Sequence, residues 1–440
     1  MAADSLPTES TPTREDLARH EIARTVVTPA LAWSLIAVFL ALIATPATID
    51  LIVSERTEGA VPRPWSQLAG VPRQVLERFR ETRMILPANR VILAGFRAFE
   101  DGLTDESAVA SALRPPAQSL LSGRLGVGNE RVYQGADGWL FYRPDVDFVI
   151  GAAFLDAGTM RRRQEGEREW VEQPQPDPRI ALVEFKRQLE RRGIALVVMP
   201  TPVKPAMHPE KLGRARSWTI PVQNPSYRAL IDALRRNQVM VFDAAEQLAA
   251  AGGASAPYLA TDTHWRPEAM ERTAELLGRF IQTQFLFGDA PSQHYRVEPR
   301  EVTNVGDIAT MLDLPAGHRL NQPESVTIHR VLDAEGQPWR PSPGADVLVL
   351  GDSFSNIYSL ASLGWGDSAG FVEHLARVLD RPVDRIVQND DGAYATRERL
   401  RQDMASGSDR LRDKRVVVLQ FAARELAAGD WKRIELPATP

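Results

Sequence analysis

A serine that could act as a nucleophile stands in the stretch LVLGDSFSN, directly after an apolar run typical of a buried strand. Gly351 allows a tight turn, so Ser353 would lie at the carboxyl edge of a sheet, where the next helix begins with unpaired backbone amides. A serine there can attack a carbonyl carbon while its own N–H faces the developing oxyanion. The alternative is that Asp352 or Ser353 only caps the helix. Taken alone, the tripeptide GDS favours the capping alternative.

A base for such a nucleophile could come from the stretch TDTHW, in which Asp262 and His264 flank one residue. In an extended loop, side chains at i and i+2 point to the same side, so Asp262 could accept a hydrogen bond from one imidazole nitrogen. The other nitrogen would then be free to act as a base. Trp265 offers a flat apolar surface of the kind that packs on a sugar ring. The alternatives are a helix entry in which Asp262 only satisfies backbone amides, and a metal site, for which no third ligand lies at a suggestive spacing. We therefore expect no metal.

Further polar groups follow other expected strand ends. Asn389 and Gly392 come after a short strand, where a side-chain amide or a backbone N–H could provide a second oxyanion donor. Lys204 lies in a Pro-rich loop and could face a polar ligand. Arg424 follows the last strand, where it could hold a substrate or, as the safer interpretation, pair with Glu425.

Strands that alternate with helices would position these residues. Five apolar runs predict strands, at 194–200, 239–243, 345–351, 384–389 and 414–421. Apolar periodicity predicts helices, at 177–193, 226–238, 267–285, 371–380 and 393–406. This alternation is typical of an α/β fold, a mostly parallel sheet flanked by helices on both faces. Ligands bind beyond the carboxyl ends of such strands, which is where the candidate residues fall.

Near its start the chain carries no ionisable residue between Arg24 and Asp50. The run can supply the about 20 helical residues that cross a hydrocarbon layer, and it lacks the polar stripe of a core helix. A cleaved signal is the other interpretation, since ATPA holds small residues at a suitable spacing. The long leader favours an uncleaved anchor. Arg14, Arg19 and Arg24 favour a cytoplasmic N-terminus, with the rest of the chain outside the cytoplasm.

The composition narrows the classes of function. The chain has 440 residues, a formal net charge of −5 and no cysteine. This excludes thiol catalysis, disulfides and cysteine-based zinc sites, and it gives no basic footprint for nucleic acid. The expected organisation is a disordered cytoplasmic tail (1–25), a transmembrane anchor (26–49), a helical stalk broken at Pro115-Pro116 (50–126), an α/β domain (127–430) and a short tail (431–440).

Taken together, GDSF and DTHW resemble the SGNH (GDSL-type) hydrolase superfamily, in which the Ser usually precedes the Asp and His. Here DTHW comes first, and one residue separates Asp262 from His264. This order resembles the SGNH-like acetyltransferases of bacterial exopolysaccharide assembly, notably the periplasmic alginate O-acetylation proteins. GADGWLF, TPVKPAMHPEKL and VVVLQFAARELA support the resemblance, which covers Arg131 to Leu426. Ala269 departs from the family pattern, in which a glycine is common at this position.

The resemblance implies roles for the candidate residues. Ser353 would be the nucleophile, His264 its general base and Asp262 the residue that orients His264, in an acetyl transfer through acetyl-serine that needs no cofactor. It also implies a polysaccharide acceptor such as alginate and a multi-pass membrane O-acyltransferase that supplies acetyl groups. The implied location is the cell inner membrane, with the catalytic domain in the periplasm. Two other functions stay open: a polysaccharide acetyl esterase with the same triad, and a non-catalytic polysaccharide-binding scaffold of an export complex.

Overall fold

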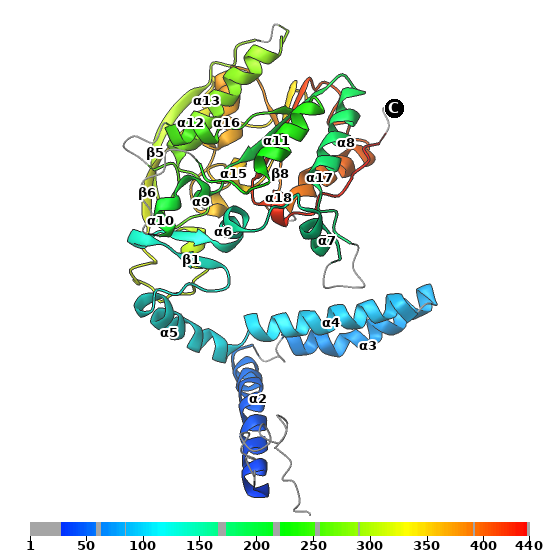
Figure 1. Ribbon diagram of the computed structural model, residues 1–440, viewed down its shortest axis with the longest axis vertical. Helices are drawn as coiled ribbons and strands as arrows, with labels where there is room; N and C mark the ends of the chain where they lie inside the picture. The colour runs from blue at the N-terminus through cyan, green and yellow to red at the C-terminus, as the bar shows by residue number, and fades with distance from the viewer. Residues whose placement is uncertain are drawn as a thin grey trace, which may run out of the picture. The chain divides into compact units, whose positions relative to one another are not determined.

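The computed structural model describes residues 28–437 apart from short gaps, at 59–62, 84, 166–172, 214–220, 251–255, 289–290 and 390–391. The predicted tail 1–25 lies outside the described residues. The chain forms two compact units, divided between Leu113 and Arg114 (Figure 1). Among the described residues, the first unit holds helices only and the second holds the α/β architecture.

The apolar run near the N-terminus is one helix, α2, which covers Pro29–Glu58. Its segment Pro29–Arg56 is long and apolar enough to cross a membrane. At about 1.5 Å per residue, a helix of this length exceeds the about 30 Å of a hydrocarbon core. The helix continues through Pro46 and past the predicted boundary at residue 49. Asp50 does not end it, because the Asp50 carboxylate accepts a hydrogen bond from the N–H of Ala108 at 2.8 Å.

Two amphipathic helices follow, α3 (Arg63–Thr82) and α4 (Ile85–Asp105), and they pack against each other. A side chain at position 95 would overlap Val71 of the facing helix, so Gly95 permits the close approach of the two helices. The pair is therefore a tightly packed helical hairpin.

The next helix, α5 (Ala108–Arg124), contains Pro115 and Pro116 and does not end at them. The predicted break at this pair is wrong. Ser111 and Ala112, about one turn earlier, are exposed. Water can therefore take the place of the N–H donors that the prolines lack.

The second unit begins with a short antiparallel pair of strands, β1 (Val132–Gln134) and β2 (Leu140–Tyr142), followed by helix α6 (Arg143–Ile150). Its centre is a five-stranded sheet in the order β4-β3-β9-β7-β8, in which every pairing is parallel. The strands are β3 (Ala195–Thr201), β4 (Met240–Val241), β7 (Val347–Gly351), β8 (Asp384–Val387) and β9 (Val416–Ala422). The α/β fold class predicted from the sequence is confirmed.

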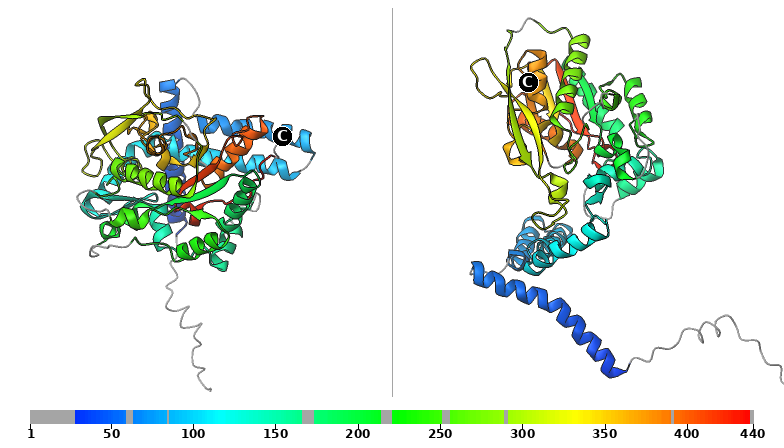
Figure 2. Two further views of the ribbon diagram at one scale, coloured as in Figure 1. Left: turned by 90° about the horizontal axis from the view of Figure 1, so that it is seen from above. Right: turned by 90° about the vertical axis from the view of Figure 1, so that its left-hand side faces the viewer.

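Helices cover both faces of this sheet (Figure 2). Neighbouring residues of β3 point to opposite faces, so Val197 and Met199 join one core while Leu196 and Val198 join the other. The first core includes residues of α13 (Pro267–Gln284) and α16 (Phe371–Leu379). The second includes residues of α8 (Pro178–Glu190), α11 (Tyr227–Arg236) and α17 (Ala395–Ala405).

An antiparallel hairpin of β5 (Arg296–Asn304) and β6 (Glu324–Leu332) lies outside the central sheet, and no sequence pattern predicted it. The first six residues of β5 are exposed. A strand that is polar on both faces lacks the alternation by which strands are recognised. The remaining helices are short: η1 (Ala136–Gly138), α7 (Ala157–Glu165), α9 (Lys204–Met207), α10 (Pro209–Leu212), α12 (Ala245–Ala250), α14 (Asp307–Thr310), α15 (Ser353–Asn356), η2 (Ala361–Leu363), η3 (Gly392–Tyr394) and α18 (Glu425–Ala428).

The C-terminal segment packs onto the α/β unit. Trp431 and Ile434 are buried. The amide of Gln188 in α8 donates to the carbonyl of Ile434 at 2.9 Å and accepts from the N–H of Leu436 at 2.8 Å. The described residues 431–437 of the predicted short tail (431–440) thus add apolar side chains to the core.

Candidate active site

Ser353 is the first residue of α15 and follows the end of the fully buried strand β7 by two residues. Asp352 caps this helix: its Oδ1 accepts from the N–H of Phe354 at 2.9 Å, and its Oδ2 accepts from the N–H of Ala422 at 2.6 Å. The capping role weighed for the GDS tripeptide thus belongs to Asp352. The side chain of Ser353, which is half-buried, is left available for chemistry.

The three residues singled out by sequence form a continuous chain of hydrogen bonds. His264 Nε2 lies 2.8 Å from Ser353 Oγ, and His264 Nδ1 lies 2.7 Å from Asp262 Oδ1. An ionised carboxylate only accepts hydrogen bonds, so Nδ1 carries the proton and Nε2 is free to accept one from the serine hydroxyl. This is the geometry in which an imidazole can remove a hydroxyl proton.

The Asp262 carboxylate is buried and accepts hydrogen bonds at both oxygens. Besides the imidazole, its donors are the N–H of His264 at 3.0 Å, the N–H of Asp307 at 3.1 Å and the Trp365 indole at 2.9 Å. Burial by itself raises the pKa of Asp262, but the bond to His264 and the imidazolium charge outweigh it and hold that pKa below its usual value. For His264, burial lowers the pKa, and the Asp262 carboxylate outweighs burial and raises it. The pair therefore stabilises an imidazolium, the form that would result when neutral His264 takes up the serine proton.

A second carboxylate, Asp307 at the start of α14, was missed by sequence reasoning. Its two oxygens accept from the N–H and the hydroxyl of Thr263 at 2.7 and 2.8 Å, so it holds the residue between Asp262 and His264. Burial, and then the charge of Asp262, raises the pKa of Asp307 to about 6. The one sequence signal for Asp307 was the Gly306-Asp307 pair at the start of a short helix. A side chain at position 306 would overlap the backbone of Thr261, so glycine permits this close approach.

Asp262, His264 and Asp307 also offer ligand atoms within 4.8 Å of one another, a spacing that a metal ion could use. Each of these side chains already has hydrogen-bond partners: both Asp307 oxygens face Thr263, and both imidazole nitrogens face the other two members of the chain. This donor and acceptor pattern fits proton transfer better than metal ligation.

Lys204 does not face a ligand, and the expectation that it would is wrong. The side chain is fully buried, and its Nζ donates to the carbonyls of Leu140 at 2.6 Å and Ala260 at 3.1 Å. Burial lowers the pKa of Lys204 to about 8. Lys204 therefore ties β2 to the loop of residues 260–265, which we call the base loop.

Trp265 is also buried, so it cannot pack on a sugar, and that expectation is wrong. Its indole N–H donates to the carbonyl of Phe354 at 3.1 Å, and its own carbonyl accepts from the Tyr358 hydroxyl at 2.6 Å. The Trp265 and Phe354 rings meet edge to face, with centroids 5.4 Å apart. Trp265 thus links the base loop to the helix that begins with Ser353.

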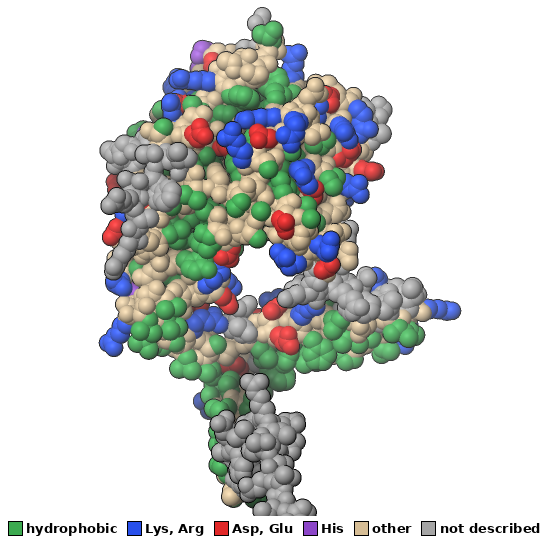
Figure 3. Space-filling view, viewed as in Figure 1, with side chains coloured by type: hydrophobic (Ala, Val, Ile, Leu, Met, Phe, Trp, Pro, Cys, Tyr) green, Lys and Arg blue, Asp and Glu red, His purple; other side chains and the backbone are tan. Residues whose placement is uncertain are grey.

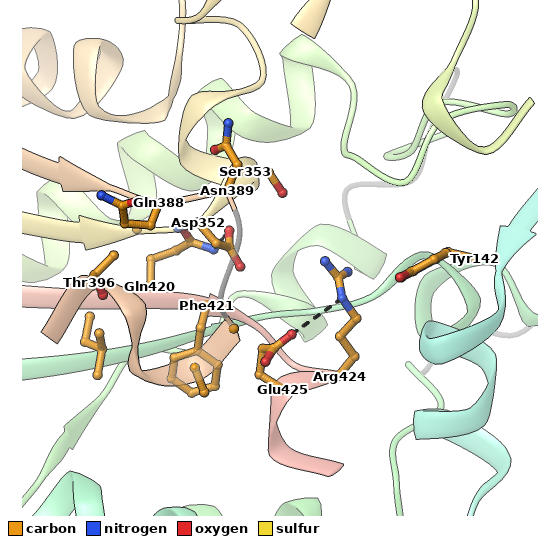
Figure 4. Close-up of a pocket in the computed structure, with 14 residues that line it drawn as sticks. Tyr142, Asp352, Ser353, Gln388, Asn389, Thr396, Gln420, Phe421, Arg424 and Glu425 are labelled. Carbon is orange, nitrogen blue, oxygen red and sulfur yellow. Dashed lines mark hydrogen bonds and ion pairs between the residues drawn. The ribbon is translucent and has the colours of Figure 1, made fainter. Parts of the chain in front are cut away.

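A cavity of about 200 Å³ lies beside Ser353 (Figure 4). Asn389, Gly392 and Arg424, all proposed from the sequence, line this cavity. Other residues that line it are Tyr142, Gly351, Asp352, Gln388, Ala393, Thr396, Leu419, Gln420, Phe421 and Glu425. The structure therefore gathers the predicted nucleophile and three of the predicted substrate or oxyanion residues around one space.

Arg424 is held by two carboxylates. Its guanidinium donates to Asp145 at 3.0 Å and lies 3.8 Å from Glu425, as the pairing interpretation expected. Burial by itself lowers the pKa of Arg424, but these carboxylates outweigh it and hold the pKa above its usual value. Arg424 is therefore a fixed cation at the cavity (Figure 4).

Asn389 and Gly392 are both exposed where they line the cavity. Asn389 is exposed, and its side-chain oxygen accepts from Asn356 at 3.3 Å. Gly392 has a φ of +66°, a conformation that favours glycine. The structure places both residues at the cavity; their part in oxyanion binding stays a prediction.

Comparison with known proteins places this chain in a family. The family described as "SGNH hydrolase-like domain, acetyltransferase AlgX" matches residues 132–423. The chain belongs to this family. The predicted family and fold are therefore confirmed, and the match nearly coincides with the range over which the resemblance was seen.

Individual relatives agree. A "Probable alginate O-acetylase AlgJ" of Pseudomonas aeruginosa is 29% identical over 230 residues, 51% of this chain and 53% of the relative. The protein of the same name from Pseudomonas syringae pv. tomato is 26% identical over 188 residues, 42% of each chain. This chain thus spans about half the length of the curated relatives it matches. The solved O-acetyltransferase domain of Pseudomonas putida AlgJ aligns with a TM-score of 0.50 at 22% identity, covering 67% of this chain and 92% of that one, and supports the fold.

Proposed function

We propose that this protein is a membrane-anchored O-acetyltransferase that moves acetyl groups, through acetyl-Ser353, to hydroxyls of an exopolysaccharide. The observation that carries the proposal is the hydrogen-bonded chain Asp262–His264–Ser353 at a cavity, in a member of an acetyltransferase family. The names of the relatives point to alginate or a similar polymer as the acceptor.

In the first step, Ser353 Oγ gives its proton to His264 Nε2 and attacks the carbonyl carbon of an acetyl donor. The N–H of Ser353 and a group of Asn389 or Gly392 would bind the oxyanion that forms. When the tetrahedral intermediate collapses, the bond to the leaving group breaks, and the leaving group takes the proton from His264. Acetyl-Ser353 and neutral His264 remain.

In the second step, His264 removes the proton of a sugar hydroxyl, whose oxygen attacks acetyl-Ser353. Collapse of this intermediate returns the proton to Ser353 and releases the acetylated sugar. Transfer exceeds hydrolysis only if the sugar is held better than water. The cavity is smaller than the about 300–1,000 Å³ of pockets that enclose a drug-sized ligand, so it suits an acetyl group and part of one sugar. Arg424 would bind a polar group of the donor or acceptor.

The proposed setting is the periplasmic side of the cell inner membrane. Helix α2 would span the membrane once, with residues 1–25 in the cytoplasm and the catalytic domain, residues 127–430, outside it. Because the periplasm lacks acetyl-CoA, acetyl groups would arrive from a multi-pass membrane O-acyltransferase.

The test uses the purified full chain, an activated acetyl ester, and acidic or neutral oligosaccharides. We expect acetyl esters on the sugar with the native chain, none with Ser353→Ala, and native activity with the control Ser406→Ala, an exposed serine at the end of α17. Release of acetate into water without any sugar ester would replace the transferase with an esterase. Full polymer acetylation in cells that carry Ser353→Ala would instead indicate a scaffold.

A further inference from the structure

The α3–α4 hairpin exposes large apolar side chains that its own packing does not use. Leu76 and Phe79 of α3 are 57% and 44% exposed, and Ile85 and Phe96 of α4 are 77% and 50% exposed. Figure 3 shows apolar side chains gathered along one side of this pair of helices. We call these four residues the outer apolar face.

The spacing of these residues gives each helix an apolar stripe. Leu76 and Phe79 are three positions apart, and Ile85 and Phe96 are eleven apart, or about three turns, so each pair shares one side of its helix. The contact between the helices uses other positions, among them Val71 and Gly95. The hairpin is thus amphipathic beyond what its own packing requires.

The chain itself indicates what covers this face. Helix α2 ends at Glu58 and α3 begins at Arg63. The four residues between them can reach at most about 18 Å. If α2 spans the membrane, the start of α3 therefore lies near the headgroup layer that borders the hydrocarbon core.

We propose that the outer apolar face lies in the interfacial layer of the membrane that α2 crosses, so that the hairpin is a second, surface-bound membrane contact. The proposal rests on the membrane anchor of the proposed function. Amphipathic helices with Lys or Arg on their polar side bind bilayers in this way, with their apolar face among the headgroups and upper acyl chains. Helix α3 carries four arginines and two glutamates, which suits anionic lipids. The hairpin would keep the start of the catalytic unit at the membrane surface, where a membrane protein would deliver acetyl groups.

The absence of cysteine from the chain allows a direct test. The test uses three single variants of the full chain: Phe79→Cys, Gln74→Cys and Phe39→Cys. Each variant is labelled with an environment-sensitive fluorophore and reconstituted into phosphatidylethanolamine–phosphatidylglycerol vesicles with brominated acyl chains. Phe79 belongs to the outer apolar face, exposed Gln74 lies on the other side of α3, and Phe39 lies within α2. We expect bromine to quench the fluorophore, and its emission to shift to shorter wavelength, at positions 79 and 39 but not at position 74.

Each alternative gives a different pattern. Quenching at position 39 without quenching at position 79 would overturn the proposal that the hairpin lies in the interfacial layer, but not the membrane anchor. No quenching at position 39 would overturn the anchor itself. If the thiol of Phe79→Cys is protected from labelling in native membranes, but its fluorophore is not quenched in lipid vesicles, the outer apolar face contacts a protein. That result would overturn the lipid proposal. If Phe79→Cys fails to fold, Ile85→Cys on the same face replaces it, with the same expected results.

Discussion

On one side of Ser353, the base loop of residues 260–265 is hydrogen-bonded at almost every position. On the other side, Asn389 and Gly392 line the same cavity, and both are exposed. In the base loop the Thr261 carbonyl accepts from Ala309, while Asp307 holds Thr263. The groups proposed for proton transfer are thus preorganised by the fold, whereas the groups proposed to bind the acyl oxygen are exposed. Mutations on the two sides should therefore differ in effect.

The largest effect on the base side is expected from Asp262→Asn. An Asn side chain can donate toward His264 Nδ1 and so stabilise the imidazole tautomer with its proton on Nε2, which cannot accept the serine proton. We expect acetyl-transfer kcat to fall about 10⁴-fold, as for the comparable change in serine proteases. The measurement is turnover of an activated acetyl ester together with the melting temperature. A loss under about tenfold would show that Asp262 does not set the tautomer.

On the other side, Asn389→Ala should reduce kcat about 10²- to 10³-fold, the usual effect of removing one oxyanion donor. Because Asn389 is exposed, the melting temperature should not change. The matched control is Asn356→Ala, which removes the Asn389 side chain's bonding partner but not the proposed donor, and it should cost much less. Native kcat in Asn389→Ala would leave backbone N–H groups as the oxyanion donors.

A smaller change, Asp307→Asn, tests whether the base loop also tunes His264. The negative charge of Asp307 is one of the groups that raise the pKa of His264. Catalysis needs neutral His264, so removing that charge should move the acid limb of the pH–rate profile to lower pH. Weakening the bonds to Thr263 should lower kcat about tenfold, since a hydrogen bond to a charged group is worth roughly 1.5–3 kcal/mol.

The control for this variant is Asp313→Asn, an exposed carboxylate that pairs with Arg114. It should leave both kcat and the pH profile unchanged. Because the pKa of Asp307 is about 6, the native profile should approach that of Asp307→Asn at pH values below 6, where Asp307 is protonated. An acid limb that stays in place would contradict an electrostatic role for Asp307.

The difference between the two sides also explains what the sequence could predict. The strands that precede Ser353 and Arg424 are largely apolar runs, and Asp262 and His264 are two positions apart, so local patterns were enough to find these four residues. Residue type alone does not reveal burial. For this reason the sequence predicts ligand contact for Lys204 and Trp265, although both side chains are buried and bond to neighbouring backbone groups.

Long-range partners were beyond local patterns. Asp307 contacts the base loop only because the chain returns to this loop after β5. The sequence of β5 does not show the alternation of apolar and polar residues by which a strand is recognised. Likewise, Pro115 and Pro116 predicted a break from local propensity, but the helix continues through them because the turn before them is exposed to water. Local sequence thus predicted the residues that the structure brings together, Asp262, His264 and Ser353, and tertiary structure decided which residues support them.

The central claim is that Ser353 carries the acetyl group. The most direct measurement is mass spectrometry of the full chain, quenched soon after mixing with an activated acetyl ester in the absence of sugar. We predict one added acetyl group on the peptide that contains Ser353, its disappearance when oligosaccharide is added, and no such adduct in Ser353→Ala or His264→Ala. Native turnover with no acetyl on Ser353 at any time, or with the acetyl group on another residue, would contradict the account.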